Sequence, residues 1–232
     1  MGVISRFLKL STIGGVATIG AHFIWTRNSI VEPLPRTDYL FTSPSYKKTN
    51  PNDNAVLRDV CIRRVPLSQI DPKLLEKKGK LVEKFCAGLW GGLGYAYQRQ
   101  YLAKKYQGPK TAHQLWSTNE LLTATYEIGT EITDHFQVVE KTDNRVVVRC
   151  GDSPLNRGLR ETDGLFEMSV DVKKDEGVAE FQLKSIFFNG LSGTKVEGSV
   201  MPWHIELLHR EYSKILMEVY KLSSVWYEIY TF

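Results

Sequence analysis

The stretch LFEMSVDVKKDEGVAEFQLKSIFF, residues 165–188, constrains the fold of this chain more than any other segment. Apolar and polar residues alternate along both of its arms, and the polar run KKDEG separates the arms. Such alternation is typical of a strand with one buried face, and a short polar run between two such strands predicts a hairpin. One face of the predicted hairpin carries Phe166, Met168, Phe181, Leu183 and Phe187. The pattern predicts an antiparallel sheet with one apolar face, which fits both a filled core and a cavity for an apolar ligand.

The opposite face of the same hairpin carries polar and charged side chains, among them Glu167, Glu180 and Lys184. Side chains of these types are seldom buried unless they are paired. We therefore expect this second face to contact water.

Residues 56–222 are predicted to form one α+β domain. The segment AVLRDVCIRRVPL predicts a first strand, which is followed by helices, by strands separated by turn residues, and by a long helix after Pro202. Apolar positions of that last helix recur at spacings of three and four: Ile205, Leu208, Tyr212 and Ile215. This spacing predicts an amphipathic helix that packs one apolar stripe on a sheet.

A glycine-rich cluster, GLWGGLGYAYQ, lies within the helical region at residues 88–98. It lacks the Gly-Lys-Ser/Thr ending of a P-loop and the third glycine of a dinucleotide site, so no nucleotide or other cofactor is predicted. Two interpretations fit it: close packing of a helix on the sheet, or contact of its side chains with an anionic bilayer surface. The side chains concerned are Leu89, Trp90, Leu93, Tyr95 and Tyr97.

Residues 1–30 predict a membrane anchor or a targeting segment. They contain no acidic residue, and seventeen uncharged residues separate Lys9 from Arg27. A helix of that length spans roughly 25 Å, at the short end for crossing a bilayer. The favoured expectation is a single-pass N-terminal transmembrane helix, with a mitochondrial presequence or a cleaved secretory signal as alternatives. More basic residues follow this segment than precede it, which places the main domain in the cytosol; a mitochondrial location is the alternative.

Residues 31–55 contain four of the nine prolines together with many Asn, Ser and Thr residues. Proline removes a backbone donor, and these polar residues favour turns. This composition predicts an extended linker, and residues 223–232 are expected to form a C-terminal tail.

Charge and cysteine content exclude several classes of protein. The net charge of +4 is small and the basic residues are scattered, so no nucleic-acid partner is predicted. Three widely spaced cysteines do not form a disulfide framework or a zinc motif. His204 and His209 lie five residues apart and do not share a helix face, so no metal site is predicted.

The order strand, helices, antiparallel strands and long C-terminal helix resembles the helix-grip fold of START-like proteins, the Bet v 1 and polyketide-cyclase group. This resemblance implies a curved antiparallel sheet packed on the long C-terminal helix. The resemblance covers residues 56–222. A fainter similarity, to DUF1990-type domains, includes Gly129-Thr130, the sequence DGLFE and a basic terminal helix. Both resemblances imply a cavity between sheet and helix for a lipid, sterol, quinone or polyketide.

If the implied cavity exists, the apolar face of the hairpin is expected to line it through Phe166, Met168, Phe181, Leu183 and Phe187. Arg149 and His209 are the polar candidates for contact with a ligand. His135, beside Asp134 on a predicted strand, is the candidate for a catalytic general base.

Three functions stay open at this stage. The first is a membrane-tethered protein that binds a hydrophobic small molecule. The second is a cofactor-free cyclase, isomerase or dehydratase that acts on a lipophilic intermediate. The third is a scaffold or assembly protein of a mitochondrial membrane, which needs no cavity.

Overall fold

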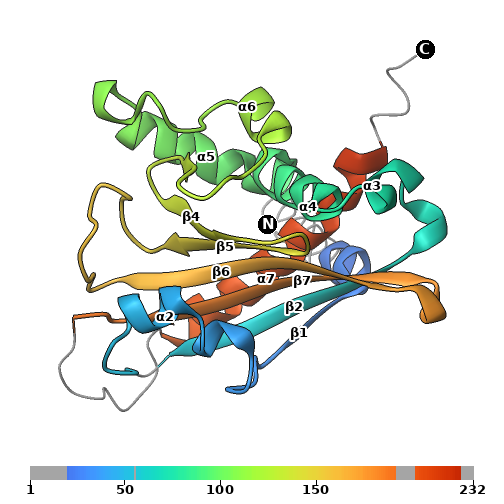
Figure 1. Ribbon diagram of the computed structural model, residues 1–232, viewed down its shortest axis with the longest axis horizontal. Coiled ribbons are helices and arrows are strands. Elements are labelled where there is room, and N and C mark those ends of the chain that lie inside the picture. The colour runs from blue at the N-terminus through green and yellow to red at the C-terminus, as the bar shows by residue number, and fades with distance from the viewer. Residues whose placement is uncertain (1–19, 55, 192–201, 226–232) are drawn as a thin grey trace, which may run out of the picture.

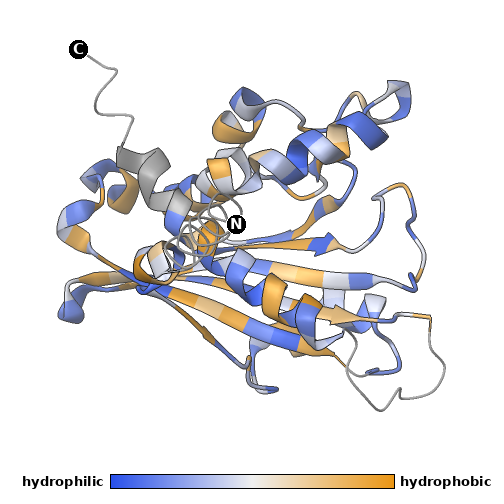
Figure 2. Ribbon diagram, turned by 180° about the vertical axis from the view of Figure 1, so that it is seen from behind, coloured by the Kyte–Doolittle hydropathy of each residue, from blue (hydrophilic) through white to orange (hydrophobic). Residues whose placement is uncertain are grey.

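The computed structural model describes residues 20–54, 56–191 and 202–225, which form an α+β fold (Figure 1). A seven-stranded sheet runs in the order β1-β2-β7-β6-β5-β4-β3, and every pairing in it is antiparallel. A long C-terminal helix crosses one face of this sheet (Figure 2). The predicted α+β class is therefore confirmed, and the arrangement is compatible with a helix-grip.

The strands are β1 (Ser29–Glu32), β2 (Leu57–Pro66), β3 (Glu131–Ile132), β4 (Phe136–Lys141), β5 (Arg145–Cys150), β6 (Asp163–Lys173) and β7 (Val178–Phe188). The α-helices are α2 (Pro44–Thr49), α3 (Pro72–Glu76), α4 (Lys80–Gly91), α5 (Leu93–Tyr106), α6 (Thr118–Thr123) and α7 (Trp203–Val225). A further helical segment at residues 20–26 precedes β1. We call the face of the sheet toward α7 the inner face and the opposite one the outer face.

The predicted hairpin is confirmed as β6 and β7. Phe166 lies opposite Ser185 and Met168 lies opposite Leu183, so the apolar side chains of both arms share the inner face. Gly177 has a φ of +66° in the connection, a conformation that a residue without Cβ adopts at little cost.

The outer face is covered near one end by residues 33–54, which do not form the predicted extended linker. This segment contains a 3-10 turn, η1 (Tyr39–Phe41), and helix α2, whose N-cap Ser43 accepts a hydrogen bond from the backbone of Tyr46. Leu40 and Tyr46 are buried against strand residues of the outer face: Val60, Val147, Leu165, Ile186 and Phe188. The prolines and polar residues thus serve as turns and caps of a folded segment.

The expectation that the outer face contacts water is wrong for all three of the charged residues named for it. Glu167 is 1% exposed, Glu180 is 6% exposed and Lys184 is 9% exposed. Lys184 Nζ lies 2.8 Å from Glu167 Oε1 and 2.8 Å from Asp38 Oδ2 of the covering segment. Lys184 is tolerated because it is paired with two carboxylates, and the pair with Asp38 connects the covering segment to the sheet.

Helix α7 packs through a different side from the one that the sequence predicts. Leu208 is 64% exposed and Ile205 is 40% exposed, whereas Ser213, Leu216 and Met217 are buried. The predicted stripe is therefore wrong in the N-terminal half of the helix.

Two charged residues of β2 set the rotation of α7. Asp59 Oδ2 lies 3.1 Å from His209 Nε2, and Arg63 forms an ion pair with Glu218. Because His209 and Glu218 reach β2 from the two flanks of α7, the side of the helix between these flanks that carries Met217 faces the sheet, and the opposite side, which carries Leu208, faces outward.

The glycine cluster serves close helix packing. A Cβ added to Gly94 would lie 3.2 Å from Leu216 Cδ2, and one added to Gly91 would lie 2.7 Å from Leu122 side-chain atoms. The partners are helices α7 and α6, not the sheet. The bilayer interpretation is wrong for three buried residues of the cluster, whereas Leu93 and Tyr97 are exposed. The buried residues are Leu89, Trp90 and Tyr95.

Most of residues 1–30 and part of the predicted tail at 223–232 lie outside the described residues. Within the described ranges, no helix combines the length and the apolar character that a membrane crossing requires.

The packing of α7 gives a matched pair of stability predictions. Met217→Ala should lower the free energy of unfolding by about 2–5 kcal/mol, because a fully buried side chain would be replaced by a cavity. Leu208→Ala should change it by less than about 0.5 kcal/mol, as is usual for exposed positions. Urea denaturation of both variants measures these changes. A larger loss for Leu208→Ala than for Met217→Ala would contradict the observed rotation of α7.

Candidate functional site

A cavity of about 320 Å³ lies between the inner face of the sheet and helices α4, α5 and α7. Strands β6 and β7, the β3–β4 turn and the beginning of the loop at residues 151–162 complete its walls. Its volume is at the lower end of the range of about 300–1,000 Å³ for small-molecule pockets. The cavity therefore suits a small ligand.

Four of the seven predicted ligand-binding residues line this cavity: Phe166, Leu183, Phe187 and His209. Met168 and Phe181 share the inner face but belong to the packed core, where the rings of Phe181 and Phe85 lie 5.3 Å apart. Arg149 does not reach the cavity, because it pairs in register with Leu165 and so points to the outer face.

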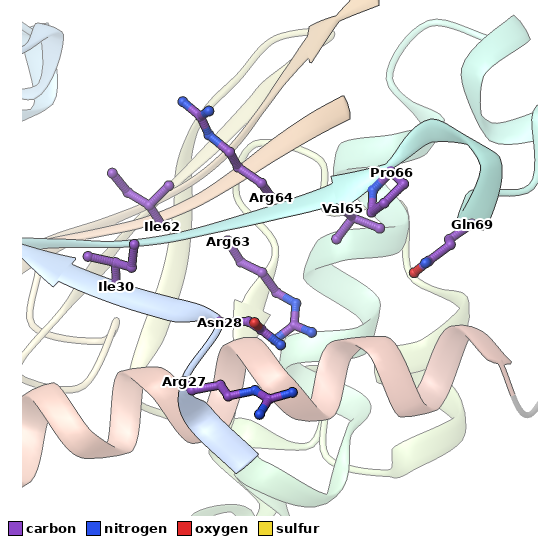
Figure 3. Close-up of a pocket in the computed structure, with 9 residues that line it drawn as sticks. All are labelled: Arg27, Asn28, Ile30, Ile62, Arg63, Arg64, Val65, Pro66 and Gln69. Carbon is purple, nitrogen blue, oxygen red and sulfur yellow. The ribbon is translucent and has the colours of Figure 1, made fainter. Parts of the chain in front are cut away.

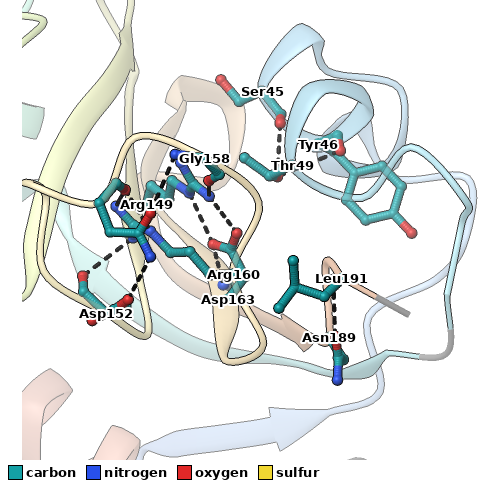
Figure 4. Close-up of polar contacts among 12 residues, drawn as sticks. Ser45, Tyr46, Thr49, Arg149, Asp152, Gly158, Arg160, Asp163, Asn189 and Leu191 are labelled. Carbon is teal, nitrogen blue, oxygen red and sulfur yellow. Dashed lines mark hydrogen bonds and ion pairs between the residues drawn. The ribbon is translucent and has the colours of Figure 1, made fainter. Parts of the chain in front are cut away.

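Arg149 instead shapes the loop at residues 151–162 from the outer side (Figure 4). Its guanidinium donates to both carboxylate oxygens of Asp163, at 2.9 and 2.5 Å, and to the carbonyl of Gly158 at 2.7 Å. Arg160, which is also buried, donates four hydrogen bonds to backbone carbonyls of the same loop. These contacts hold a cavity wall in place, so the role of both arginines is structural.

A strained turn brings His135 to the cavity. Thr133 and Asp134, between β3 and β4, have φ values of 50° and 52°, and His135 N donates to Ile132 O at 3.1 Å. This is the geometry of a type I′ turn, which normally takes Asn-Gly, and a β-branched threonine adopts it only under strain. His135 is thus a turn residue, whereas the sequence predicted a strand.

Side chains from three other elements hold this turn. Tyr95 OH lies 2.5 Å from Thr133 Oγ1, Gln114 bonds both the backbone N–H and the carboxylate of Asp134, and Ser153 Oγ donates to the same carboxylate. The Asp134 carboxylate is already engaged in these hydrogen bonds, and Asp134 does not line the cavity. Asp134, the weaker of the two candidates for a catalytic role that the sequence offers, is therefore a positioning residue for the turn, and His135 alone reaches the cavity.

The imidazole of His135 lines the cavity and is largely buried. Burial lowers its pKa below the usual histidine value, and this outweighs the opposing attraction of Asp152 and Asp134. A neutral imidazole offers one nitrogen as a hydrogen-bond acceptor or a general base.

His209 approaches the cavity from α7 and is held on several sides. Its Nε2 lies 3.1 Å from Oδ2 of the buried Asp59, and its ring contacts Phe187 edge-on with centroids 5.1 Å apart. A carboxylate that fixes an imidazole is a common arrangement in sites that use histidine. Here it also attaches α7 to β2.

Two buried polar atoms among the lining residues have no hydrogen-bond partner in the described part of the chain: Trp90 Nε1 and Ser185 Oγ. An unsatisfied buried polar atom costs about 1–3 kcal/mol. In an otherwise apolar cavity, a ligand oxygen or a water is the partner that such atoms require.

The other ionisable groups of the lining are neutral at pH 7. Burial raises the pKa of the Cys150 thiol, and it raises the pKa of Tyr212 to about 12. Tyr212 OH donates to Gln98 Oε1 at 3.0 Å and so connects α7 to α5 across the cavity wall. A nucleophilic thiolate is therefore not available in this cavity.

The sequence did not identify Trp90, Asp59 and Tyr212 as residues of the site, because they come from separate elements. The only local signal was Ser185, a polar residue within the apolar face of the hairpin. No family model, curated protein or solved structure matches this chain. The fold and the cavity alone therefore define the class: a small α+β protein with an apolar internal site.

The lowered pKa of His135 predicts a loss of stability in acid. As the pH falls below about 6.5, the unfolded chain takes up a proton that folded His135 resists, so the free energy of unfolding decreases. His135→Gln should have a shallower dependence in this window, whereas exposed His204→Gln should follow the wild type. Urea denaturation between about pH 5 and 7 measures the slopes. Equal slopes for wild type and His135→Gln would contradict a depressed pKa.

Proposed function

We propose that this protein binds a small, mainly apolar molecule with one oxygen function in the cavity between the sheet and α7. The observation that carries this proposal is the pair of unpartnered polar atoms, Trp90 Nε1 and Ser185 Oγ, among the lining of an otherwise apolar cavity. A hydroxyl or carbonyl oxygen of the ligand would satisfy them, and the phenylalanine rings would cover its apolar body.

The same proposal includes the START-like assignment. Its support is the order of elements, the antiparallel sheet, the C-terminal helix and the position of the cavity between the two. The volume of about 320 Å³ favours a compact sterol-, quinone- or polyketide-like molecule over a lipid with two acyl chains.

Membrane tethering through residues 1–30 is also part of the proposal. Besides the uncharged N-terminal run, three consecutive large side chains on the helical segment at 20–26 are more than one third exposed: Phe23, Ile24 and Trp25. Exposed aromatic and aliphatic side chains of this kind favour the bilayer interface. A tether would keep the cavity close to a source of apolar molecules.

Occupancy of the cavity is tested on the full-length protein purified in detergent. We expect native mass spectrometry to detect a co-purifying apolar molecule on the wild type, and Ser185→Phe to abolish it, because the new ring would fill the site. Ser169→Phe, on the outer face of the neighbouring strand, is the matched control and should keep the ligand.

Two results would count against the cavity as a binding site. One is a wild type that carries no ligand and binds no fluorescent apolar probe. The other is a Ser185→Phe variant whose free energy of unfolding falls by about 1–3 kcal/mol while its probe binding does not change, since overpacking of a filled core alone has that effect on stability.

A second candidate function is cofactor-free acid–base catalysis on the bound molecule. The observation that favours it is the strained Thr133-Asp134 turn, held from three elements, which presents a neutral histidine to the cavity. Strained residues of this kind cost about 1–3 kcal/mol each and concentrate at functional sites. His135 would act as the base toward a proton next to a carbonyl group.

A deuterium-exchange experiment distinguishes acid–base catalysis from ligand binding alone. The co-purified molecule is incubated with the protein in D₂O and followed by mass spectrometry. If His135 is a base, the wild type should introduce deuterium and His135→Gln should slow this by about 10²-fold or more while still binding the molecule. Exchange that is absent, or equal in both proteins, would leave only the binding function.

A further inference from the structure

A second pocket, of about 450 Å³, opens at the edge of the sheet where β1 is shorter than β2 (Figure 3). The pairing of β1 with β2 ends at Ser29 opposite Arg63, but β2 continues as Arg64–Pro66 against β7 alone. The pocket occupies the space beside these unpaired residues. It is separate from the cavity described above, and the two share no lining residue.

Arg63 forms the inner wall of this pocket. Its side chain is only 5% exposed, and its Nε is buried without a hydrogen-bond partner. Glu218 of α7 is paired with the guanidinium, and Ser29 Oγ fixes that carboxylate by donating to Oε1 at 2.8 Å. The buried arginine is therefore positioned from one side and has unused donor capacity.

Arg27 gives the pocket a net positive charge. It lines the pocket, is exposed, and has no ion-pair partner in the described ranges. Since Arg63 is balanced by Glu218, one positive charge remains uncompensated. Asn28 and Gln69 add neutral amide donors to the same lining.

Arg64 also borders the pocket, but its side chain leaves from the opposite side of β2, away from Arg63 (Figure 3). Its guanidinium is paired with Glu180 at 2.9 Å and with Glu176 at 3.3 Å. Arg64 is therefore an internal control: an adjacent arginine with the same charge and no free donors aimed at the site.

We propose that this pocket binds a phosphate group. Arginine forks match phosphate oxygens in bidentate geometry, and the two amides can donate to the oxygens that remain. An isolated carboxylate would use fewer of these donors. The opening toward solvent admits an esterified phosphate as well as a free one.

The position of the pocket makes a lipid head group one source of this phosphate. Arg27 lies two residues after Trp25, the last of the exposed Phe23, Ile24 and Trp25, in the segment predicted to meet the membrane. Basic residues next to interfacial aromatic residues are typical of contacts with anionic lipids. The phosphate site does not depend on what the internal cavity binds.

Thermal unfolding of the full chain in zwitterionic detergent tests the site. One arm adds inorganic phosphate at constant ionic strength, and the other adds phosphatidic acid to the micelles, with phosphatidylcholine, a zwitterion of zero net charge whose phosphate is a diester, as the comparison. We expect Tm to rise with the phosphate ligand, because binding to the folded state alone stabilises it. Arg27→Gln should weaken the apparent affinity about tenfold, whereas Arg64→Gln should leave it unchanged.

The double variant Arg63→Gln/Glu218→Gln removes the inner wall without leaving a buried charge, and it should also lose the response. A response to both ligands identifies a general phosphate site, and a response to phosphatidic acid alone identifies the lipid head group as the source. No response to either ligand, or equal losses in Arg27→Gln and Arg64→Gln, would overturn the proposal. Ser185→Phe, which blocks the internal cavity, should keep the response, so failure of one site is distinguishable from failure of the other.

Discussion

Two polar contacts between β2 and α7, Asp59 with His209 and Arg63 with Glu218, determine where the helix lies, and both sites depend on them. Asp59 and Arg63 are four residues apart on an extended strand, a span of about 13 Å. Their partners His209 and Glu218 are nine residues apart on a helix, a span of about 14 Å. The two spans match, so α7 can satisfy both pairs at once in a single register.

Nine helical residues also rotate by half a turn, so His209 and Glu218 lie on opposite flanks of α7. The His209 flank faces the internal cavity, and the Glu218 flank faces the short strand β1 and the phosphate pocket proposed there. Gly94 completes this arrangement, because its missing side chain lets α5 approach Leu216. Close packing is thus found in the middle of α7, at residues 213–218. The N-terminal half is held by His209, and space for a ligand remains beside it.

The sequence predicted the features that depend on the local alternation of apolar and polar residues. It did not predict the features that depend on contacts between charged residues far apart in the chain. Strands β6 and β7 follow from a period of two, and their inner face is the one predicted. The stripe of α7 was misassigned because the hydrophobic pattern gave no sign that His209 and Glu218 would be bound by β2. Similarly, the composition of residues 33–54 suggests a linker. The sequence does not reveal that this segment folds over the outer face, where Asp38 pairs with Lys184 and Lys184 pairs with Glu167. Part of the candidate site was predictable for the same reason, because Phe166 and Phe187 lie on alternating strands. Trp90 reaches the cavity from α4, and His135, which was named as a candidate base, reaches it from a turn where the sequence predicted a strand.

The β3–β4 turn bears on the choice between binding and catalysis. Its strain is balanced by contacts from Tyr95, Gln114 and Ser153, a larger set than a two-residue hairpin connection requires. Asn-Gly at these positions would remove the strain, but it would also remove the Thr133 and Asp134 side chains through which the turn is held. What these side chains secure is the placement of an uncharged imidazole in the lining of the same cavity as the unpartnered Trp90 Nε1 and Ser185 Oγ. In the proposed function, one hydrogen-bond acceptor and two donors around a small apolar space would select a ligand by the position of its oxygen. The proposed binding would need this selection, and proton transfer by His135 would be a further use of the same arrangement.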